Sequence, residues 1–472
     1  MKRSNKNKSV RNNSARGFGK GLESLETRQM FSASPLDFYT VGTQLVCELA
    51  NPSEQVTVVR SSNGIQFNVN GQVENVVGNF SYLSILAQSG NNSIVIGPNM
   101  NIGTCVWGGN GTDLLSTGAN NTTLHAGSGN ETLVALGSND VLDAGSGYDN
   151  LWSNYNNYYN SGSGTMVTHF FSSFINTSDG TLDGQLIDEP QTNTASQFNG
   201  GWENVSALPL FSSIGPNMFD INQGQCGDCY FMSGLGAIAR VDPQQIRNSI
   251  TALGDGTYAM EFYNNGTPEY VRVDGYLPEE NGQLFYANLG LGNSTWAALM
   301  EKGYAYFDSM VQGYTPDYGV IDQGGFADPT LDQLLGDNAQ GTYNTMFNTD
   351  SMAMFGGNAN TFAGWINWQM QQGKAIEIAF GNDETDAQDS FSLNNILENH
   401  HMYTLASETT NSAGQITGFW VHNPWGVDIQ NPQTDAFELA AKGHNCGVDD
   451  GLVWVSVAQA FSVCSDIGAA VV

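Results

Sequence analysis

The chain has 472 residues, of which 40% are apolar, and a formal net charge of -31. This length predicts two or three folded units rather than one domain. Eight of its 15 Lys and Arg lie in the first 35 residues, so the remainder is strongly acidic. An acidic surface repels phosphates and excludes nucleic acid as the expected partner. No apolar run approaches the ~18 residues of a membrane-spanning helix, so we expect none.

Residues 1–35 form a basic leader without the apolar stretch of an ordinary signal peptide. Within it, residues 22–33 read Leu-Glu-Ser-Leu-Glu-Thr-Arg-Gln-Met-Phe-Ser-Ala. This segment resembles the short N-terminal motif of large exported proteins of planctomycete bacteria. The resemblance implies a secreted or cell-surface bacterial protein. The alternative is a disordered basic tail.

A nine-residue repeat follows the leader and spans residues 109–151. Its five leucines are Leu115, Leu124, Leu133, Leu142 and Leu151. Six residues before each leucine stands Gly109, Gly118, Gly127, Leu136 or Gly145, and two residues before stands Asp113, Thr122, Glu131, Asp140 or Asp149. Such a period predicts stacked units of a glycine-rich turn and a short strand, with the leucines pointing inward.

The repeat resembles the calcium-binding nonapeptides of the hemolysin-type (RTX) toxins, which implies an all-β parallel β-roll. In a roll, turns on one side recur every second repeat, so Asp113, Glu131 and Asp149 share one side. We expect calcium there and not on the side of Thr122 and Asp140; the alternative is a metal-free solenoid. We assign residues 36–154 to this solenoid. Residues 155–204 are rich in Asn, Ser, Thr and Gly and predict a polar linker, with a short strand near 166–171.

The sharpest local signal is residues 222–231, Asn-Gln-Gly-Gln-Cys-Gly-Asp-Cys-Tyr-Phe. Apolar residues then recur at helical spacing, so Cys229 is expected to open a helix whose N-terminus favours a thiolate. Gln223 is positioned to donate its amide to an oxyanion, together with the Cys229 backbone N–H. Cys226 and Cys229 also form a Cys-x-x-Cys, so a redox pair, half of a zinc site or a structural cysteine remain as alternatives.

His401 is the expected base. His401–Leu405 and Ile416–Val421 alternate as strands around a turn at 411–414, and a hairpin there pairs residues whose numbers sum to about 825. Asn423 would then face His401 and fix its tautomer, with Trp425 shielding the bond. His400 would point to the opposite face. Structural or surface roles are expected for His400, His422 and His444.

These motifs together resemble the core of calpain-type cysteine peptidases of the papain superfamily. The resemblance rests on Gln-Gly-x-x-Gly-Asp-Cys at 223–229, His-x-Tyr at 401–403 and Asn-Pro-Trp-Gly at 423–426, with further similar segments at 271–278, 296–305 and 450–457. It implies an α+β, papain-like two-lobed domain over residues 205–472, with Cys229 on a helical lobe and His401 and Asn423 on a β lobe. It implies the Cys229–His401–Asn423 triad with Gln223 as oxyanion helper.

The same resemblance carries two further expectations. Calpain cores often bind calcium, which makes Asp220 a candidate ligand. Papain relatives carry a disulfide cysteine at the place of Cys226, which implies pairing with Cys446 or Cys464.

We therefore expect a calcium-dependent type of cysteine endopeptidase acting on polypeptides, with possible cell-surface association. One alternative is a catalytically silent calpain-like module on a calcium-binding surface or adhesion protein. Another is an acyl transferase using the same Cys-His chemistry. A further hypothesis is that residues 36–200 are a removable pro-region.

Overall fold

The computed structural model describes residues 36–154, 156–171, 180–182, 185–187, 189–192, 198–336, 355–381, 391–392, 397–427 and 450–472. The expectations for the basic leader, for His444 and for Cys446 fall outside these residues. Within them, no helix has the length and apolar character needed to cross a bilayer.

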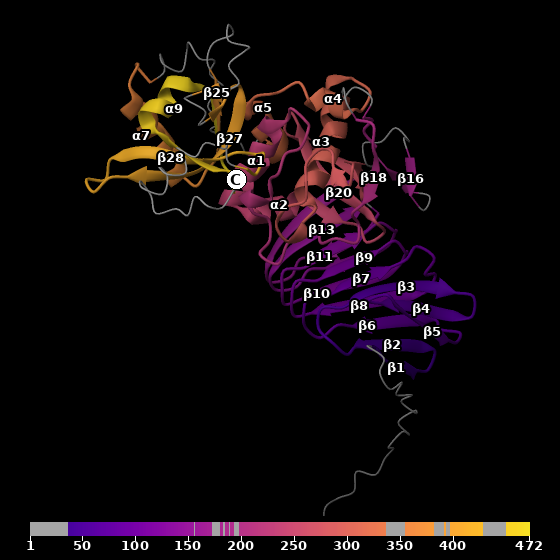
Figure 1. Ribbon diagram of the computed structural model, residues 1–472. Coiled ribbons are helices and arrows are strands. Elements are labelled where there is room, and N and C mark those ends of the chain that lie inside the picture. Colours follow the sequence, from indigo (N-terminus) through magenta and orange to yellow (C-terminus); the bar gives the residue numbers. More distant parts are fainter. Residues whose placement is uncertain are drawn as a thin grey trace, which may run out of the picture.

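The repeats form a β-solenoid of about 5 turns over residues 82–170, built from two facing parallel sheets. One sheet contains β6 (Tyr82–Leu86), β8 (Gly103–Gly109), β10 (Thr122–Gly127), β12 (Val141–Asp143) and β14 (Tyr158–Asn160). The other contains β7 (Ser93–Ile96), β9 (Leu114–Thr117), β11 (Thr132–Ala135), β13 (Tyr148–Asn154) and β15 (Thr165–Phe171). Figure 1 shows these strands stacked from indigo to purple.

The predicted leucine ladder lies inside the solenoid, where all five side chains are fully buried. Leu115, Leu133 and Leu151 are paired across neighbouring strands of one sheet, and Leu124 pairs with Leu142 in the other. Consecutive repeats therefore alternate between the two sheets, and each coil takes two repeats.

The solenoid begins with antiparallel strands, which the repeat did not predict. β1 (Leu36–Val41) and β2 (Gln44–Leu49) form a hairpin, and β3 (Gln55–Ser61), β4 (Gly64–Val69) and β5 (Gln72–Val77) form a meander. β2 and β3 then pair in parallel with β6 and β7. These antiparallel strands thus cover the first coil of the solenoid and extend both of its sheets.

The segment expected to be a linker contributes to both neighbours. β14 and β15 are the last parallel strands of the solenoid, so it extends to Phe171. Within 180–204, β16 (Gly180–Leu182) pairs with β17 (Gln185–Ile187), and β18 (Gly201–Asn204) pairs with β22 (Tyr276–Glu280) of the following region. The boundaries at 154 and 204 therefore both cut through strand pairings.

The following region has two hydrophobic cores. The first lies among helices α1 (Cys229–Val241), α2 (Pro243–Ser249), α3 (Trp296–Gln312), α4 (Tyr318–Ile321) and α5 (Ala327–Leu335). It also takes in strands β19 (Ile250–Ala252), β20 (Thr257–Asn264), β21 (Thr267–Asp274), β22 and β23 (Gln283–Leu284), with short 3₁₀ turns at η1 (Met218–Asp220) and η2 (Leu291–Asn293).

The second core packs a five-stranded sheet against two helices. The sheet has the order β29-β28-β27-β24-β30, with bounds Leu452–Ser456, Ile416–His422, His401–Thr410, Ala375–Phe380 and Cys464–Ala470. The helices are α7 (Ala359–Gln371) and α9 (Val457–Val463), and a small pair, β25 (Phe391–Ser392) and β26 (Leu397–Glu398), lies apart from the sheet. Figure 1 shows α1 between this sheet and the helices of the first core.

One edge of the solenoid packs directly on the first core. Trp152 is fully buried and belongs to a separate apolar cluster with Leu253, Ala259 and Tyr270. Its ring stacks on His169, whose Nδ1 lies 3.2 Å from the Glu261 carboxylate. Through this buried contact the solenoid packs against the region that follows.

Candidate active site

The candidate nucleophile stands where α1 begins, as its helical apolar spacing predicts. Phe231, Leu235 and Ile238 are buried in the first core, which fixes the helix axis. Cys229 is the first helical residue and is half-buried. Its sulfur therefore lies next to backbone N–H groups that have no partner within the helix.

The strand that carries His401 is fastened to this helix. Ser233 Oγ donates to the Met402 carbonyl at 3.0 Å, and Thr404 Oγ1 donates to the Ser233 carbonyl at 2.7 Å. The backbone N–H of Met402 is hydrogen-bonded to the Cys229 sulfur. The residue directly after His401 is thus in contact with the nucleophile. Met402 itself is buried in the first core.

His401 and Asn423 meet across the hairpin. His401 Nε2 lies 2.9 Å from Asn423 Oδ1, and both side chains are buried. The Asn423 amide is oriented by a donation from its Nδ2 to the Val427 carbonyl at 3.1 Å. The half-buried Trp425 ring lies 4.5 Å from the imidazole, centroid to centroid, and covers one side of it.

The observed register differs slightly from the one expected from the turn. Leu405 pairs with Val421 and Thr404 with His422, and irregularities follow Leu405 and Thr409. In each pair the two residue numbers therefore sum to one or two more than the value of about 825 expected from the turn. His401 and Asn423 still meet because a side-chain contact does not require directly opposite backbone positions.

Burial favours the uncharged forms of both groups. It raises the pKa of the Cys229 thiol to about 12, although the backbone N–H groups of Met402 and Tyr230 oppose the rise. It lowers the pKa of His401 to about 4, against the hydrogen bond to Asn423. At neutral pH the pair is therefore a thiol and a neutral imidazole, able to accept a proton.

The rival histidines have other surroundings. His400 is exposed and adopts a left-handed backbone conformation with φ of 53° in the turn before β27. His422 is buried against Phe219, with 5.4 Å between ring centroids. Neither is hydrogen-bonded to Asn423 in the part of the chain that the structure describes.

Comparison with known proteins identifies the family. The profile of calpain family cysteine proteases matches residues 185–435, which is more than half of the chain. The chain belongs to the calpain family of cysteine proteases. Calpain clp-4 of Caenorhabditis elegans is 34% identical over 106 residues, 21% of this chain and 15% of that protein. The chicken calpain-2 catalytic subunit is 32% identical over 108 residues, again 21% and 15%. These matches therefore span about 15% of the length of these relatives.

Gln223 of this calpain-family chain is held within its own loop. Its Nε2 donates to the Cys226 carbonyl and, at 3.1 Å, to Asp228 Oδ1. Both amide hydrogens therefore have partners, and one must be released before Gln223 can bind an oxyanion. Gln223, the expected oxyanion donor, therefore lies in the loop before Cys229 with both of its amide hydrogens already bound.

Two expectations drawn from calpain and papain relatives need correction. Asp220 Oδ1 accepts from Leu291 N and Ser294 Oγ, and Oδ2 accepts from Asn217 N and Trp296 Nε1. Both oxygens are thus committed to binding two loops and α3, so Asp220 is a structural residue rather than a calcium ligand. Cys226 and Cys464 are both free thiols, so they do not form the suggested disulfide.

The solenoid carboxylates lie at its turns and are buried. Asp113 Oδ1 accepts from Asn92 N at 2.7 Å, and Asp149 Oδ1 accepts from Glu131 N at 3.3 Å. Asp140 on the other side does the same for Thr122 N at 2.8 Å. Among the described atoms, Asp113 Oδ2 and both Glu131 oxygens have no hydrogen-bond partner. Burial and Asp149 raise the pKa of Glu131 to about 8.

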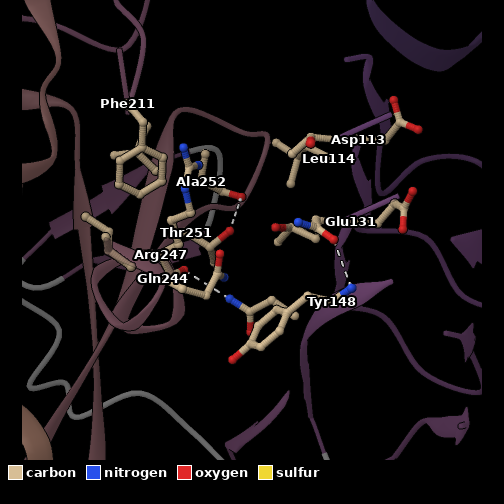
Figure 2. Close-up of a pocket in the computed structure, with 15 residues that line it drawn as sticks. Asp113, Leu114, Glu131, Tyr148, Phe211, Gln244, Arg247, Thr251 and Ala252 are labelled. Carbon is tan, nitrogen blue, oxygen red and sulfur yellow. Dashed lines mark hydrogen bonds between the residues drawn. The ribbon is translucent and has the colours of Figure 1, made fainter. Parts of the chain in front are cut away.

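A cavity of about 330 Å³ lies between the solenoid and the protease region. Figure 2 shows Arg247 and Phe211 on the protease side, with Tyr148 on the solenoid side. The carboxylates of Asp113 and Glu131 turn away from the protease residues. None of the proposed catalytic residues lines the cavity, whereas Asp113 and Glu131 are among its lining residues.

Sequence reasoning missed one part of the site. In the described residues, the single trio of metal-ligand type side chains with atoms within 4.8 Å of one another is Cys226, Asp228 and Glu301. Glu301 lies in the segment 296–305 that resembles calpains, but no spacing rule connects it to Cys229. Its contact with Asp228 depends on how α3 packs beside α1.

Proposed function

We propose that this chain is a cysteine endopeptidase with Cys229 as nucleophile, His401 as base and Asn423 as the residue that orients the base. The observation that carries the proposal is the buried 2.9 Å bond between His401 and Asn423, on a strand fastened to the helix that begins at Cys229. Membership of the calpain family supports peptide bonds as the bonds cleaved. Polypeptides are the proposed substrates.

The proposed reaction starts from the neutral pair. His401 Nδ1 takes the thiol proton as the Cys229 sulfur attacks the peptide carbonyl, and the imidazolium is stabilised by Asn423 through Nε2. The oxyanion is received by the Cys229 backbone N–H and by an amide hydrogen released from Gln223. His401 then protonates the leaving amine, and water activated by His401 hydrolyses the thioester.

We further propose that the two hydrophobic cores act as the two lobes of a papain-like peptidase. Cys229 packs against the helical core, whereas His401 lies on β27 of the five-stranded sheet and Asn423 directly follows its strand β28. The substrate would then lie along the contact between α1 and β27. Its side-chain preference would depend on the loops at either end of that contact.

We also propose that the turns of the solenoid bind calcium. Calcium prefers carboxylate and carbonyl oxygens. Asp113 Oδ2 and the two Glu131 oxygens are buried without hydrogen-bond partners among the described atoms, and they lie on the side predicted from the repeat. Calcium would neutralise these oxygens and stiffen the turns. From the basic leader we further propose that the chain is exported and associates with the cell surface.

The test is cleavage of unfolded casein by the purified full chain, with Cys229→Ala and Cys226→Ser as a matched pair. We expect Cys226→Ser to retain activity and Cys229→Ala to lose it. Parallel lanes with calcium and with chelator measure the calcium requirement. Absence of cleavage by folded wild-type protein would instead favour a silent binding module, and product bearing an added amine would favour an acyl transferase.

A further inference from the structure

The loop before the nucleophile rests on a buried pair of carboxyl groups. Asp228 directly precedes Cys229, Glu301 comes from α3, and neither side chain is more than 1% exposed. One oxygen of each carboxyl group lies within 4.8 Å of the other and of the Cys226 sulfur. Glu301 Oε2 accepts from Ala287 N at 2.9 Å, and Asp228 Oδ1 accepts from Gln223. Asp228 Oδ2 and Glu301 Oε1 have no hydrogen-bond partner among the described atoms.

Two carboxyl groups buried this close together repel each other when both are ionised, which favours a proton on one of them. Neither group takes part in an ion pair within the described part of the chain. Lys302, next to Glu301, pairs instead with Glu189 and Asp274. The titratable groups that face the pair are thiols, phenols and one further carboxyl: Cys226, Cys229, Tyr230, Tyr286, Tyr304, Tyr318 and Asp322.

These surroundings favour retention of the proton. Burial raises the pKa of Asp228 to about 7, and burial together with Asp228 raises the pKa of Glu301 well above its usual range. Two like charges at this separation in a buried site repel strongly. The pair therefore holds one proton at neutral pH and releases it as the pH rises.

We propose that the proton shared by Asp228 and Glu301 controls how tightly Gln223 is held, and so whether its amide can reach the oxyanion formed at Cys229. With the proton present, Asp228 is a weak acceptor, and Gln223 can turn one hydrogen to the substrate. Without it, Asp228 is a full carboxylate and retains that hydrogen. The inference rests on the proposed peptidase function. Asp228 and Glu301 are positioning residues in it.

The expected consequence is a loss of kcat as the pH rises above neutrality, with KM nearly unchanged, since an oxyanion donor acts in the transition state. The thiol cannot cause such a loss, because burial raises the pKa of Cys229 to about 12. The released proton passes to solvent, and no other bond changes.

Reciprocal isosteric substitutions test the inference because they act in opposite directions. Asp228→Asn stays neutral while keeping an acceptor for Gln223, so kcat should be independent of pH between about 6 and about 9. Glu301→Gln gives Asp228 an amide donor in place of an acid, which stabilises the Asp228 carboxylate. Its kcat should be about tenfold lower throughout, as for one lost oxyanion donor or less. Asp322→Asn keeps an acceptor for Gly227 N but removes a charge that raises the pKa of Asp228, so its loss of kcat should have the wild-type amplitude and begin at a lower pH.

Two controls separate this mechanism from simple destabilisation. In a Gln223→Ala background, neither substitution should alter kcat further. The infrared band of a buried protonated carboxyl should be weaker in both variants than in wild type, a readout that needs no activity. Equal shifts of both profiles in one direction, or an unchanged infrared band, would overturn the inference while leaving the peptidase proposal intact. Lack of cleavage by wild type would remove the peptidase proposal instead, and the infrared comparison would still decide the shared proton.

Discussion

The solenoid and the protease region both bury carboxyl groups, but they stabilise them in different ways. In the solenoid, Asp113, Asp140 and Asp149 each accept a backbone N–H group of a neighbouring coil with one carboxylate oxygen. In the protease region, Asp228 and Glu301 depend on each other across two helices. In the solenoid, the partner of each carboxyl group thus lies at a similar distance along the chain. In the protease region, the partners come from distant segments.

The largest expected effect is at the junction of the two regions. Trp152→Ala should lower the free energy of unfolding by about 3–5 kcal/mol, because a fully buried indole between Leu253 and Tyr270 is lost. Trp107→Ala is the matched control, since that indole is 39% exposed on the outer face, and its effect should stay below about 1 kcal/mol. Denaturant unfolding checks both.

The same experiment examines the pro-region hypothesis for residues 36–200. If the solenoid is a permanent part of the folded protease region, Trp152→Ala should also lower the denaturant midpoint at which the protease region unfolds. Two separate unfolding transitions, of which only that of the solenoid is shifted, would show that the two regions unfold independently. That result would support residues 36–200 as a removable pro-region.

The next largest effect concerns the base. His401→Ala should reduce kcat/KM by at least about 100-fold, the usual contribution of a general base. His400→Ala removes the adjacent but exposed imidazole and should leave kcat/KM unchanged. A large loss in His400→Ala with activity retained in His401→Ala would reverse the assignment of the two neighbours.

A smaller effect is expected at Glu377 of β24, which is fully buried with no hydrogen-bond partner for either oxygen among the described atoms. Burial raises its pKa well above the usual range, so the folded state holds a proton that the unfolded state has lost. Stability from this group is therefore present below the unfolded pKa and falls as the pH rises towards the folded pKa.

Glu377→Gln cannot ionise and should unfold about 1–3 kcal/mol less readily than wild type at alkaline pH, with little difference near pH 4. Thermal unfolding across pH measures this. An equal effect at both pH values would show that packing rather than ionisation is responsible. The solenoid counterpart, Asp140→Asn, should be destabilising instead, because Asp140 caps a backbone N–H.

The contrast between the regions also explains what the sequence could predict. The leucine ladder could be predicted from the nine-residue spacing alone, because each repeat pairs with the second repeat after it in the chain. The end of the solenoid did not, because Leu151 pairs with Thr168, one residue short of the step from Leu133 to Leu151. A coil shortened by one residue interrupts the period although the strands continue.

In the protease region, local signals predicted the helix at Cys229 and the hairpin that brings His401 to Asn423. The partners of Asp220, the free state of Cys226 and the contact between Asp228 and Glu301 depend on packing between segments far apart in the chain. Residue type could not distinguish a carboxylate that binds calcium from one that accepts four protein hydrogen bonds.

We propose that Cys229, activated by His401 and Asn423, is the group that attacks the substrate. Its most direct test is the reaction of the full chain with a peptidyl electrophile, followed by mass spectrometry of the labelled peptides. We expect one adduct, on Cys229, formed much more slowly in His401→Ala, with the buried Cys226 unlabelled. Labelling of Cys226 in its place would exclude Cys229 as the nucleophile, and labelling of Cys229 at the same rate without His401 would exclude His401 as its base.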